Sequence, residues 1–172
     1  MTATQRAEIS TCIFSGRAMT DPVPSAISAS GEFDIEQWPF YWLTRVTGRY
    51  LHEMEIALKA LGLDIPRWRV LMSLRGDRVL SVSEIADNAI VKLPTMTRIV
   101  QRMQIDGLVR CRQSAADGRV TEVELTDAGK YAGQQAWAVA DGIYGRTFGK
   151  IPAADVAHLN RTLQALNRNL GE

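Results

Sequence analysis

The stretch VKLPTMTRIVQRMQIDGLVRCRQSAADGRVTEVELTDAG, residues 91–129, decides the fold class. At 100° per residue, its first part has one apolar and one polar side, as expected for a helix packed on a core. The apolar side holds Leu93, Met96, Ile99, Val100 and Met103, and the polar side holds Pro94, Thr95, Arg98, Gln101 and Arg102. Ile105 is the exception on the polar side. The sequence predicts an amphipathic helix that begins near Pro94 and ends at Gly107.

The second part of the stretch has the pattern of a β-hairpin. A strand begins at Leu108, the turn lies at residues 116–118, and the chain returns to Leu125. Apolar residues recur along both strands, namely Leu108, Val109, Cys111, Val120, Val123 and Leu125. Thr126 is a good N-cap, so a long helix is predicted from there to about Phe148.

Upstream of this stretch the sequence predicts three more helices. A long amphipathic helix covers Glu36 to Leu61, a second runs from about Pro66 to Leu74 behind the cap Asp64, and a short one covers Glu84 to about Asn88. Ser83 is predicted to cap the short helix. At 1.5 Å per residue the first helix is about 39 Å long, more than a domain of this size needs for its own core. It is therefore expected to pack against a partner.

The two ends of the chain differ in character. After Pro152, an apolar stripe repeats at intervals of three and four residues, as in a helix that packs on another helix. Its members are Val156, Leu159, Leu163, Leu166 and Leu170. Residues 1–35 are rich in Ser, Thr, Ala and Gly and are predicted to be an extension with little structure of its own. Ile9, Ile13 and Phe14 in that extension are candidates for a short docking helix.

The composition is typical of a globular protein with a locally basic segment. The chain has 172 residues, 46% apolar residues and a net charge of +1, which suits one globular domain. Positive charge is concentrated at residues 92–119, where six basic side chains meet two acidic ones. We expect a cytoplasmic protein because no apolar run is long enough for a membrane helix and no secretion signal is recognisable.

The sequence carries no pattern of catalysis. It has no nucleophile motif, no Gly-rich phosphate loop and no set of residues at metal-ligand spacing, and Cys12 and Cys111 stand alone. We therefore expect no enzymatic activity, no metal and no cofactor.

A mainly α-helical chain with a small β-hairpin, flanked by long helices, has the layout of a winged helix-turn-helix in a dimer. Asp117-x-Arg119, followed by Leu125-Thr126 and Asp127-x-Gly129, resembles the wing and the following helix of the MarR family. Thr97-Arg98 and Gly107-Leu108 match the family too. The resemblance implies a MarR-like domain over 36–172 after the 1–35 extension, with dimerisation helices at 36–61 and 127–172 and a winged lobe at 64–126.

That resemblance implies a homodimeric repressor that binds a pseudo-palindrome in double-stranded DNA. An α-helix fits the major groove, so Arg98 is expected to read a guanine edge and Thr95 to meet phosphates or thymine methyls. Arg102 and Lys92, with Ser83 at a helix N-terminus, are expected to contact phosphate. The full candidate set for DNA is Ser83, Lys92, Pro94, Thr95, Thr97, Arg98, Arg102, Arg112 and Arg119.

The hairpin tip has its own expected role. Arg119 resembles the family's wing arginine, which enters the minor groove, where narrow A·T tracts deepen the negative potential. Asp117 is expected to orient Arg119. Gly118 allows a tight turn, but it stands where many relatives carry a second basic residue, so the wing is expected to bind more weakly.

The resemblance also implies a small aromatic or anionic effector, such as a carboxylate, held between the dimer helices and the winged lobe. Rings and cations near the first long helix are the candidates, set against the alternative that these aromatic residues only build a core. They are Trp38, Tyr41, Trp42, Arg45, Arg49 and His52, with Trp68 behind them.

Two alternatives stay open. Cys12 or Cys111 is a candidate redox-sensing thiol in a cysteine-based repressor, although an inert cysteine is the simpler interpretation of each. The same fold could also serve as a dimeric interaction module that does not bind DNA. The sequence does not identify the effector, the operator or the regulated genes.

Overall fold

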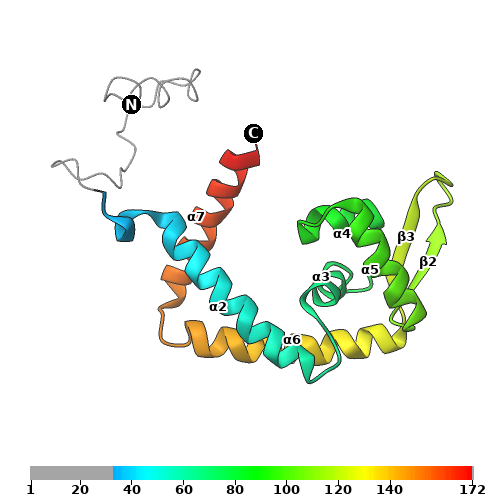
Figure 1. The fold of residues 1–172 in the computed structure, drawn as a ribbon, viewed down its shortest axis with the longest axis horizontal. Helices are drawn as coiled ribbons and strands as arrows, with labels where there is room; N and C mark the ends of the chain where they lie inside the picture. The colour runs from blue at the N-terminus through cyan, green and yellow to red at the C-terminus, as the bar shows by residue number, and fades with distance from the viewer. Residues whose placement is uncertain (1–32, 172) are drawn as a thin grey trace, which may run out of the picture. The chain divides into compact units, whose positions relative to one another are not determined.

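The computed structural model describes residues 33–171, which form helices and one small antiparallel sheet (Figure 1). Their contacts divide into two units, residues 33–45 and residues 46–171. In chain order the elements are η1 (Ile35–Gln37), α2 (Pro39–Lys59), α3 (Ile65–Ser73), β1 (Leu80–Ser81), α4 (Val82–Ala89), α5 (Leu93–Ile105), β2 (Val109–Gln113), β3 (Thr121–Leu125), α6 (Asp127–Phe148) and α7 (Ala153–Gly171). The predicted docking helix at Ile9, Ile13 and Phe14 lies outside the described residues, as does Cys12.

The first long helix begins three residues later than predicted. Asp34 accepts a hydrogen bond from the backbone N–H of Glu36 at 2.9 Å, and this cap starts the short 3₁₀ helix η1 instead. Trp38 is extended and Pro39 opens α2, which suits proline because its missing N–H has no partner to lose in a first turn. The helix then continues to Lys59.

The winged lobe is built around α3. This helix contacts α4, α5 and α6, and Asp64 caps it as predicted by accepting from the backbone N–H of Arg67 at 2.8 Å. The core consists of apolar side chains from every element of the lobe. Helix α2 adds Met54 and Leu58 to this core. The largest fully buried side chains of the core are Met54, Leu58, Val70, Leu71, Leu74, Ile85, Met96, Met103 and Val123.

Ser83 does not cap α4. The cap is Ser81, whose hydroxyl accepts from the backbone N–H of Glu84 at 3.2 Å, while the Glu84 carboxylate accepts from the Ser81 N–H at 2.7 Å. These two reciprocal bonds form a capping box, which a hydroxyl two residues farther along cannot form. Ser83 therefore lies inside the first turn, exposed, with its hydroxyl 3.0 Å from that of Ser81.

Helix α5 matches its predicted bounds, with one correction to its faces. Met96, Val100 and Met103 are buried and Ile105 is exposed, as predicted. Leu93, predicted to face the core, is 48% exposed. As the first residue of the helix it precedes the part of α5 that lies on the core.

The hairpin is confirmed, and a short strand joins it. The strand order is β1-β3-β2, all antiparallel, with Cys111 opposite Val123 and Leu80 on the other side of Val123. The predicted cap Thr126 accepts from the backbone N–H of Gly129 at 3.0 Å. A Cβ at Gly129 would collide with the backbone carbonyl of Leu108, so only glycine allows α6 to start this close to β2.

Helices α6 and α7 complete the described chain. Helix α6 is tied to the loop after α3 by an ion pair, 2.5 Å long, between Lys130 and Asp77. Within this chain, α7 buries none of its described side chains completely. Between residues 33 and 171, no helix is both long and apolar enough to cross a bilayer.

Candidate nucleic-acid interface and ligand hollow

The outer face of α5 presents the predicted DNA-contacting side chains. Pro94, Thr95, Arg98 and Arg102 are exposed, opposite the buried face of the helix. Thr97 is half-buried, and its hydroxyl donates to the carbonyl of Leu93 at 2.9 Å. The hydroxyl is therefore bonded within the first turn of the helix.

The cations of this region divide into paired and unpaired ones. On the hairpin, Arg112 pairs with Glu122 at 2.9 Å and Arg110 with Glu124 at 3.4 Å, directly across the two strands. Arg102 lies 3.4 Å from Asp106. Residues 33–171 place no carboxylate within salt-bridge distance of the three remaining basic side chains, Lys92, Arg98 and Arg119. Within this part of the chain, no carboxylate competes with a phosphate or a base for these three side chains.

The tip of the hairpin is held by the Asp117 side chain. Its carboxylate accepts from the backbone N–H of Arg119 at 2.9 Å, and its carbonyl accepts from the N–H of Val120 at 2.9 Å. The first bond closes a turn that a neutral apolar side chain would not make. Asp117 thus fixes the backbone at the position from which the Arg119 side chain extends.

Arg119 and α5 line the same surface hollow. This hollow has a volume of about 340 Å³ and is also lined by the start of α4 and part of the hairpin. Arg119 comes from the tip, Thr97 and Gln101 from α5, and Ser83 from α4. Side chains from three separate elements are therefore brought to one concave surface between a helix and a wing.

Cys111 also lines this hollow and is only half-buried. Burial raises the pKa of its thiol above the ordinary value, which lowers the fraction of reactive thiolate at neutral pH. A raised pKa is the reverse of the lowered pKa that makes a redox-sensing cysteine reactive.

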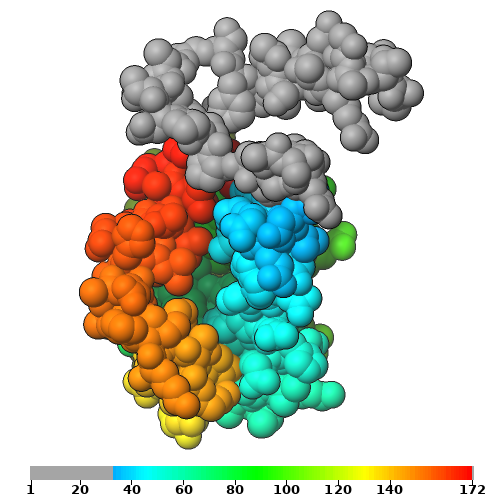
Figure 2. Space-filling view, turned by 90° about the vertical axis from the view of Figure 1, so that its left-hand side faces the viewer, coloured from blue at the N-terminus to red at the C-terminus, as the bar shows by residue number. Residues whose placement is uncertain are grey.

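A larger and mainly apolar hollow lies elsewhere in the same unit. Its volume is about 770 Å³, and Figure 2 shows it between the cyan residues of α2 and the orange residues of α6. Helix α2 contributes Tyr50 and Arg49, α3 contributes Trp68, and α6 contributes Trp137 and Tyr144 among others. Among the residues that the structure describes, the charged groups at its wall are Arg49, Glu53 and Asp141.

The predicted ligand residues are distributed unevenly. Arg49 and Trp68 line the apolar hollow, whereas His52 is exposed and does not. In the separate unit of residues 33–45, the Arg45 guanidinium lies 5.3 Å from the ring centre of Tyr41. There the Trp42 indole donates to the Glu36 carbonyl at 2.9 Å. Trp38 contacts the ring of Phe40 edge-on.

The sequence interpretation missed the contribution of α6. Trp137, Tyr144 and Phe148 are spaced by seven and four residues, so they lie on one face of the helix and line the hollow together. The Trp137 ring centre is 6.2 Å from that of Trp68, and the Arg75 guanidinium lies 3.8 Å from it. The sequence does contain this spacing, but the many small residues between the rings make the apolar face of the helix hard to recognise.

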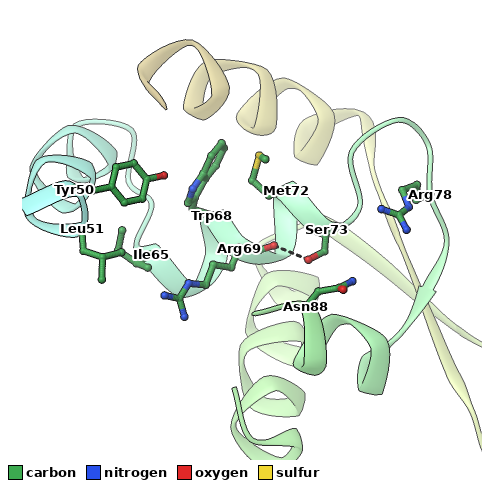
Figure 3. A pocket seen from close by; sticks show the side chains of 9 residues that line it. All are labelled: Tyr50, Leu51, Ile65, Trp68, Arg69, Met72, Ser73, Arg78 and Asn88. Atoms are coloured by element: carbon green, nitrogen blue, oxygen red, sulfur yellow. Dashed lines mark hydrogen bonds between the residues drawn. The ribbon is translucent and has the colours of Figure 1, made fainter. Parts of the chain in front are cut away.

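A second hollow beside α3 is polar. It has a volume of about 340 Å³ and is lined by the rings of Tyr50 and Trp68, the guanidinium groups of Arg69 and Arg78, and the Asn88 amide (Figure 3). Trp68 lines both this hollow and the apolar one. Helix α3 therefore forms part of the wall of both hollows. Residues 33–171 contain no group of three potential metal ligands close enough together to hold an ion.

Comparisons with known proteins agree on one family. A sequence model of the MarR family matches residues 63–121. The HTH-type transcriptional repressor IacR of Pseudomonas putida is 46% identical over 142 residues, covering 83% of this chain and 85% of its own. The HTH-type transcriptional repressor Rv2887 of Mycobacterium tuberculosis is 29% identical, over 73% of this chain and 91% of its own.

Solved structures have the same fold. A MarR-family regulator from Silicibacter pomeroyi superposes with a TM-score of 0.73 at 27% identity, covering 79% of this chain and 92% of its own. CouR from Rhodococcus jostii RHA1, solved with p-coumaroyl-CoA bound, superposes with a TM-score of 0.66 at 24% identity. That superposition covers 74% of this chain and 89% of CouR.

Proposed function

This chain belongs to the MarR family, a family of transcriptional regulators, and from that premise we propose that it is a homodimeric repressor released by a small aromatic or anionic ligand. It binds a pseudo-palindrome in double-stranded DNA through α5 and the wing. The observation that carries the proposal is that α5 and its start expose Lys92 and Arg98, and the hairpin tip exposes Arg119, without an ion-pair partner among residues 33–171.

In the proposed complex, α5 lies in the major groove. Arg98 donates to a guanine edge, Thr95 meets a phosphate or a thymine methyl, and Lys92 meets a phosphate at the start of the helix. Arg119 extends from the hairpin tip into the neighbouring minor groove, with Asp117 holding the turn. The remaining predicted contacts are Ser83, Pro94, Thr97, Arg102 and Arg112. Among these, Arg112 and Arg102 must share their charge with a carboxylate.

A homodimer gives the DNA contact its geometry. Two recognition helices held about one helical turn apart match the two halves of a pseudo-palindrome. The stripe of α7 supports self-association because Leu159 and Leu170 are 41% and 75% exposed in the single chain. A second copy of α7 is the natural cover for an apolar stripe spaced at three and four residues.

The apolar hollow is the proposed effector site. Its aromatic wall suits a flat ring, and Arg49 supplies a positive charge at its edge for an anionic group. The binding of p-coumaroyl-CoA by CouR, which shares the fold, is consistent with an aromatic effector. The effector, bound in a hollow shared by α2, α3 and α6, favours the dimer conformation that binds it better. In that conformation the spacing of the recognition helices no longer fits the operator.

A gel shift with the intergenic DNA upstream of the chain's own gene tests the DNA-binding part. We expect the wild-type protein to bind this fragment in competition with unrelated DNA, and Arg98→Ala and Arg119→Ala to bind it far more weakly. Arg146→Ala, which removes an exposed arginine of α6, is the matched control and is expected to bind normally. Failure of the wild-type protein to shift any such fragment at low salt would contradict the proposal.

The effector part is tested on the same complex. Benzoate, phenylacetate and their hydroxylated derivatives are added to the protein–DNA complex, and at least one is expected to release the DNA. Tyr144→Arg, which places a charged side chain in the hollow, is expected to keep DNA binding and to lose this release. Release that is unchanged in Tyr144→Arg would place the effector site elsewhere.

A further inference from the structure

Asp106 joins the end of the recognition helix to helix α3. It is the C-cap residue of α5, and its Oδ2 lies 2.6 Å from a guanidinium nitrogen of Arg67, in the first turn of α3. Both side chains are largely shielded, with 22% of Arg67 and 30% of Asp106 exposed. Arg67 also reaches the carbonyl of Gly62 at 3.4 Å. This is the contact that ties α5 to the beginning of α3.

The same carboxylate also holds a side chain of the proposed DNA surface. Its other oxygen, Oδ1, lies 3.4 Å from Nε of Arg102, one turn earlier in α5. Arg102 is 68% exposed on the polar face of the helix. One acidic group therefore limits the movement of both the helix end and an arginine that is directed to the outside.

Helix α3 is anchored to the other half of the helix-turn-helix in a similar way. Arg69 donates to the carbonyl of Ala89, the last residue of α4, at 2.9 Å. Between these two arginines, Trp68 lines the hollows, and Figure 3 shows its ring and the Arg69 side chain leaving α3 in different directions. Two arginines of α3, the helix that borders the hollows, thus donate the hydrogen bonds that hold α4 and the end of α5.

We propose that Asp106 is a positioning residue for DNA binding, and that the Arg67–Asp106 pair holds α5 in the orientation that reads the major groove. The inference rests on the proposed function. It assigns a supporting role to a residue that does not itself need to touch DNA. Base contacts tolerate only small displacements, so loosening the end of α5 weakens every contact made by that helix.

Simple electrostatics predicts the opposite effect of removing Asp106. A carboxylate beside a DNA-binding face repels phosphates, so its neutralisation alone would raise the affinity for DNA. A positioning role predicts a lower affinity instead. The sign of the change therefore separates the two explanations.

The experiment measures fluorescence anisotropy of a labelled duplex from the upstream intergenic DNA, with the full chain and five variants. We expect Asp106→Asn and Arg67→Gln each to bind about tenfold more weakly, which is about the effect of losing one base contact. The double variant should be no weaker than either single one, and Asp106→Glu should recover most of the affinity. Asp87→Asn is the matched control, because Asp87 is an exposed carboxylate of α4 with no ion pair among residues 33–171. It should bind as tightly as wild type or more tightly.

Thermal unfolding of each variant is measured beside the titration. It distinguishes a variant that does not fold from a folded variant in which α5 is displaced. Should Asp106→Asn be unfolded, Arg67→Lys carries the same prediction, because it removes the guanidinium that contacts Asp106 and leaves the net charge unchanged. If wild type binds the duplex and folded Asp106→Asn binds equally or more tightly, the positioning role is wrong while the proposed function stands. If wild type binds no duplex, the proposed function itself fails.

Discussion

At the scale of single residues, Ile90 is the clearest strained position. It forms the C-cap of α4 with φ of 54° and ψ of 49°, and its side chain is 90% exposed. A β-branched residue in the left-handed region is costly, by about 1–2 kcal/mol, because Cβ crowds the backbone. No burial offsets this cost, so the strain should show in the stability of the protein.

We predict that Ile90→Gly raises the free energy of unfolding by about 1 kcal/mol, because glycine adopts this conformation without strain. Urea denaturation followed by circular dichroism measures the change. The same substitution at Ile56, exposed in the middle of α2, is the control and should lower stability by about 0.5 kcal/mol. Destabilisation by both substitutions would show that Ile90 is not strained.

Individual cations could be predicted only in part from the sequence. The helical period placed Arg98 and Arg102 on the polar face of α5, and that placement is confirmed. The pairing of Arg112 with Glu122 could not be predicted, because it depends on the hairpin register, which the sequence left open. The net positive charge of residues 92–119 therefore overstates the charge available to a partner.

At the scale of elements, the start of α4 depends on the capping box of Ser81 and Glu84. We predict that Ser81→Ala lowers the free energy of unfolding by about 1 kcal/mol, since it removes the cap. Ser83→Ala should change it by less than about 0.5 kcal/mol, because Ser83 is exposed and caps nothing. Each variant loses one hydroxyl group relative to wild type. Equal losses in the free energy of unfolding, measured by chemical denaturation, would contradict the assignment of the cap.

The same box predicts a pH dependence. Hydrogen bonds from the Ser81 backbone and side chain lower the pKa of Glu84 below its ordinary value of 4.5. A carboxylate with a lowered pKa in the folded state stabilises the protein above pH 4.5, and this contribution is lost as the pH falls through the lowered pKa. Glu84→Gln should therefore melt below wild type at pH 7, and the gap should narrow at pH 3. A gap in melting temperature that stays constant from pH 7 to pH 3 would contradict this.

Most elements could be predicted because their apolar period is unambiguous, as in α5. The two-residue strand β1 could not, since so short a segment has no period of its own and is defined only by its pairing with β3. The prediction of Ser83 as the cap of α4 is wrong because the capping-box spacing runs from Ser81 to Glu84, three residues later.

At the scale of the whole molecule, self-association is the property that most needs a test. We predict that Leu159→Arg shifts the protein toward the monomer in sedimentation equilibrium and weakens its binding to a pseudo-palindrome, because a charge is placed in the stripe of α7. Ala157→Arg lies on the opposite side of the same helix and should remain dimeric. A monomeric wild type, or two variants that behave alike, would contradict the role of the stripe.

The hollows are the part of the molecule that the sequence could least predict. The apolar hollow combines residues from α2, α3 and α6, which are far apart in the chain and meet only in the folded unit. Clustering of rings in the sequence pointed instead to Trp38, Tyr41 and Trp42. Of the seven predicted ligand residues, only Arg49 and Trp68 line the apolar hollow within residues 46–171.

The central claim is that α5 reads DNA sequence through Arg98. The most direct test is the ratio of affinities for the upstream operator duplex and for an unrelated duplex, measured by anisotropy at one salt concentration for wild type, Arg98→Ala and Lys92→Ala. We predict that Arg98→Ala lowers the free-energy difference that corresponds to this ratio by about 1–3 kcal/mol per half-site. Lys92→Ala should weaken binding to both duplexes alike and leave the ratio unchanged. A wild-type ratio near one, or an unchanged ratio in Arg98→Ala, would contradict the account.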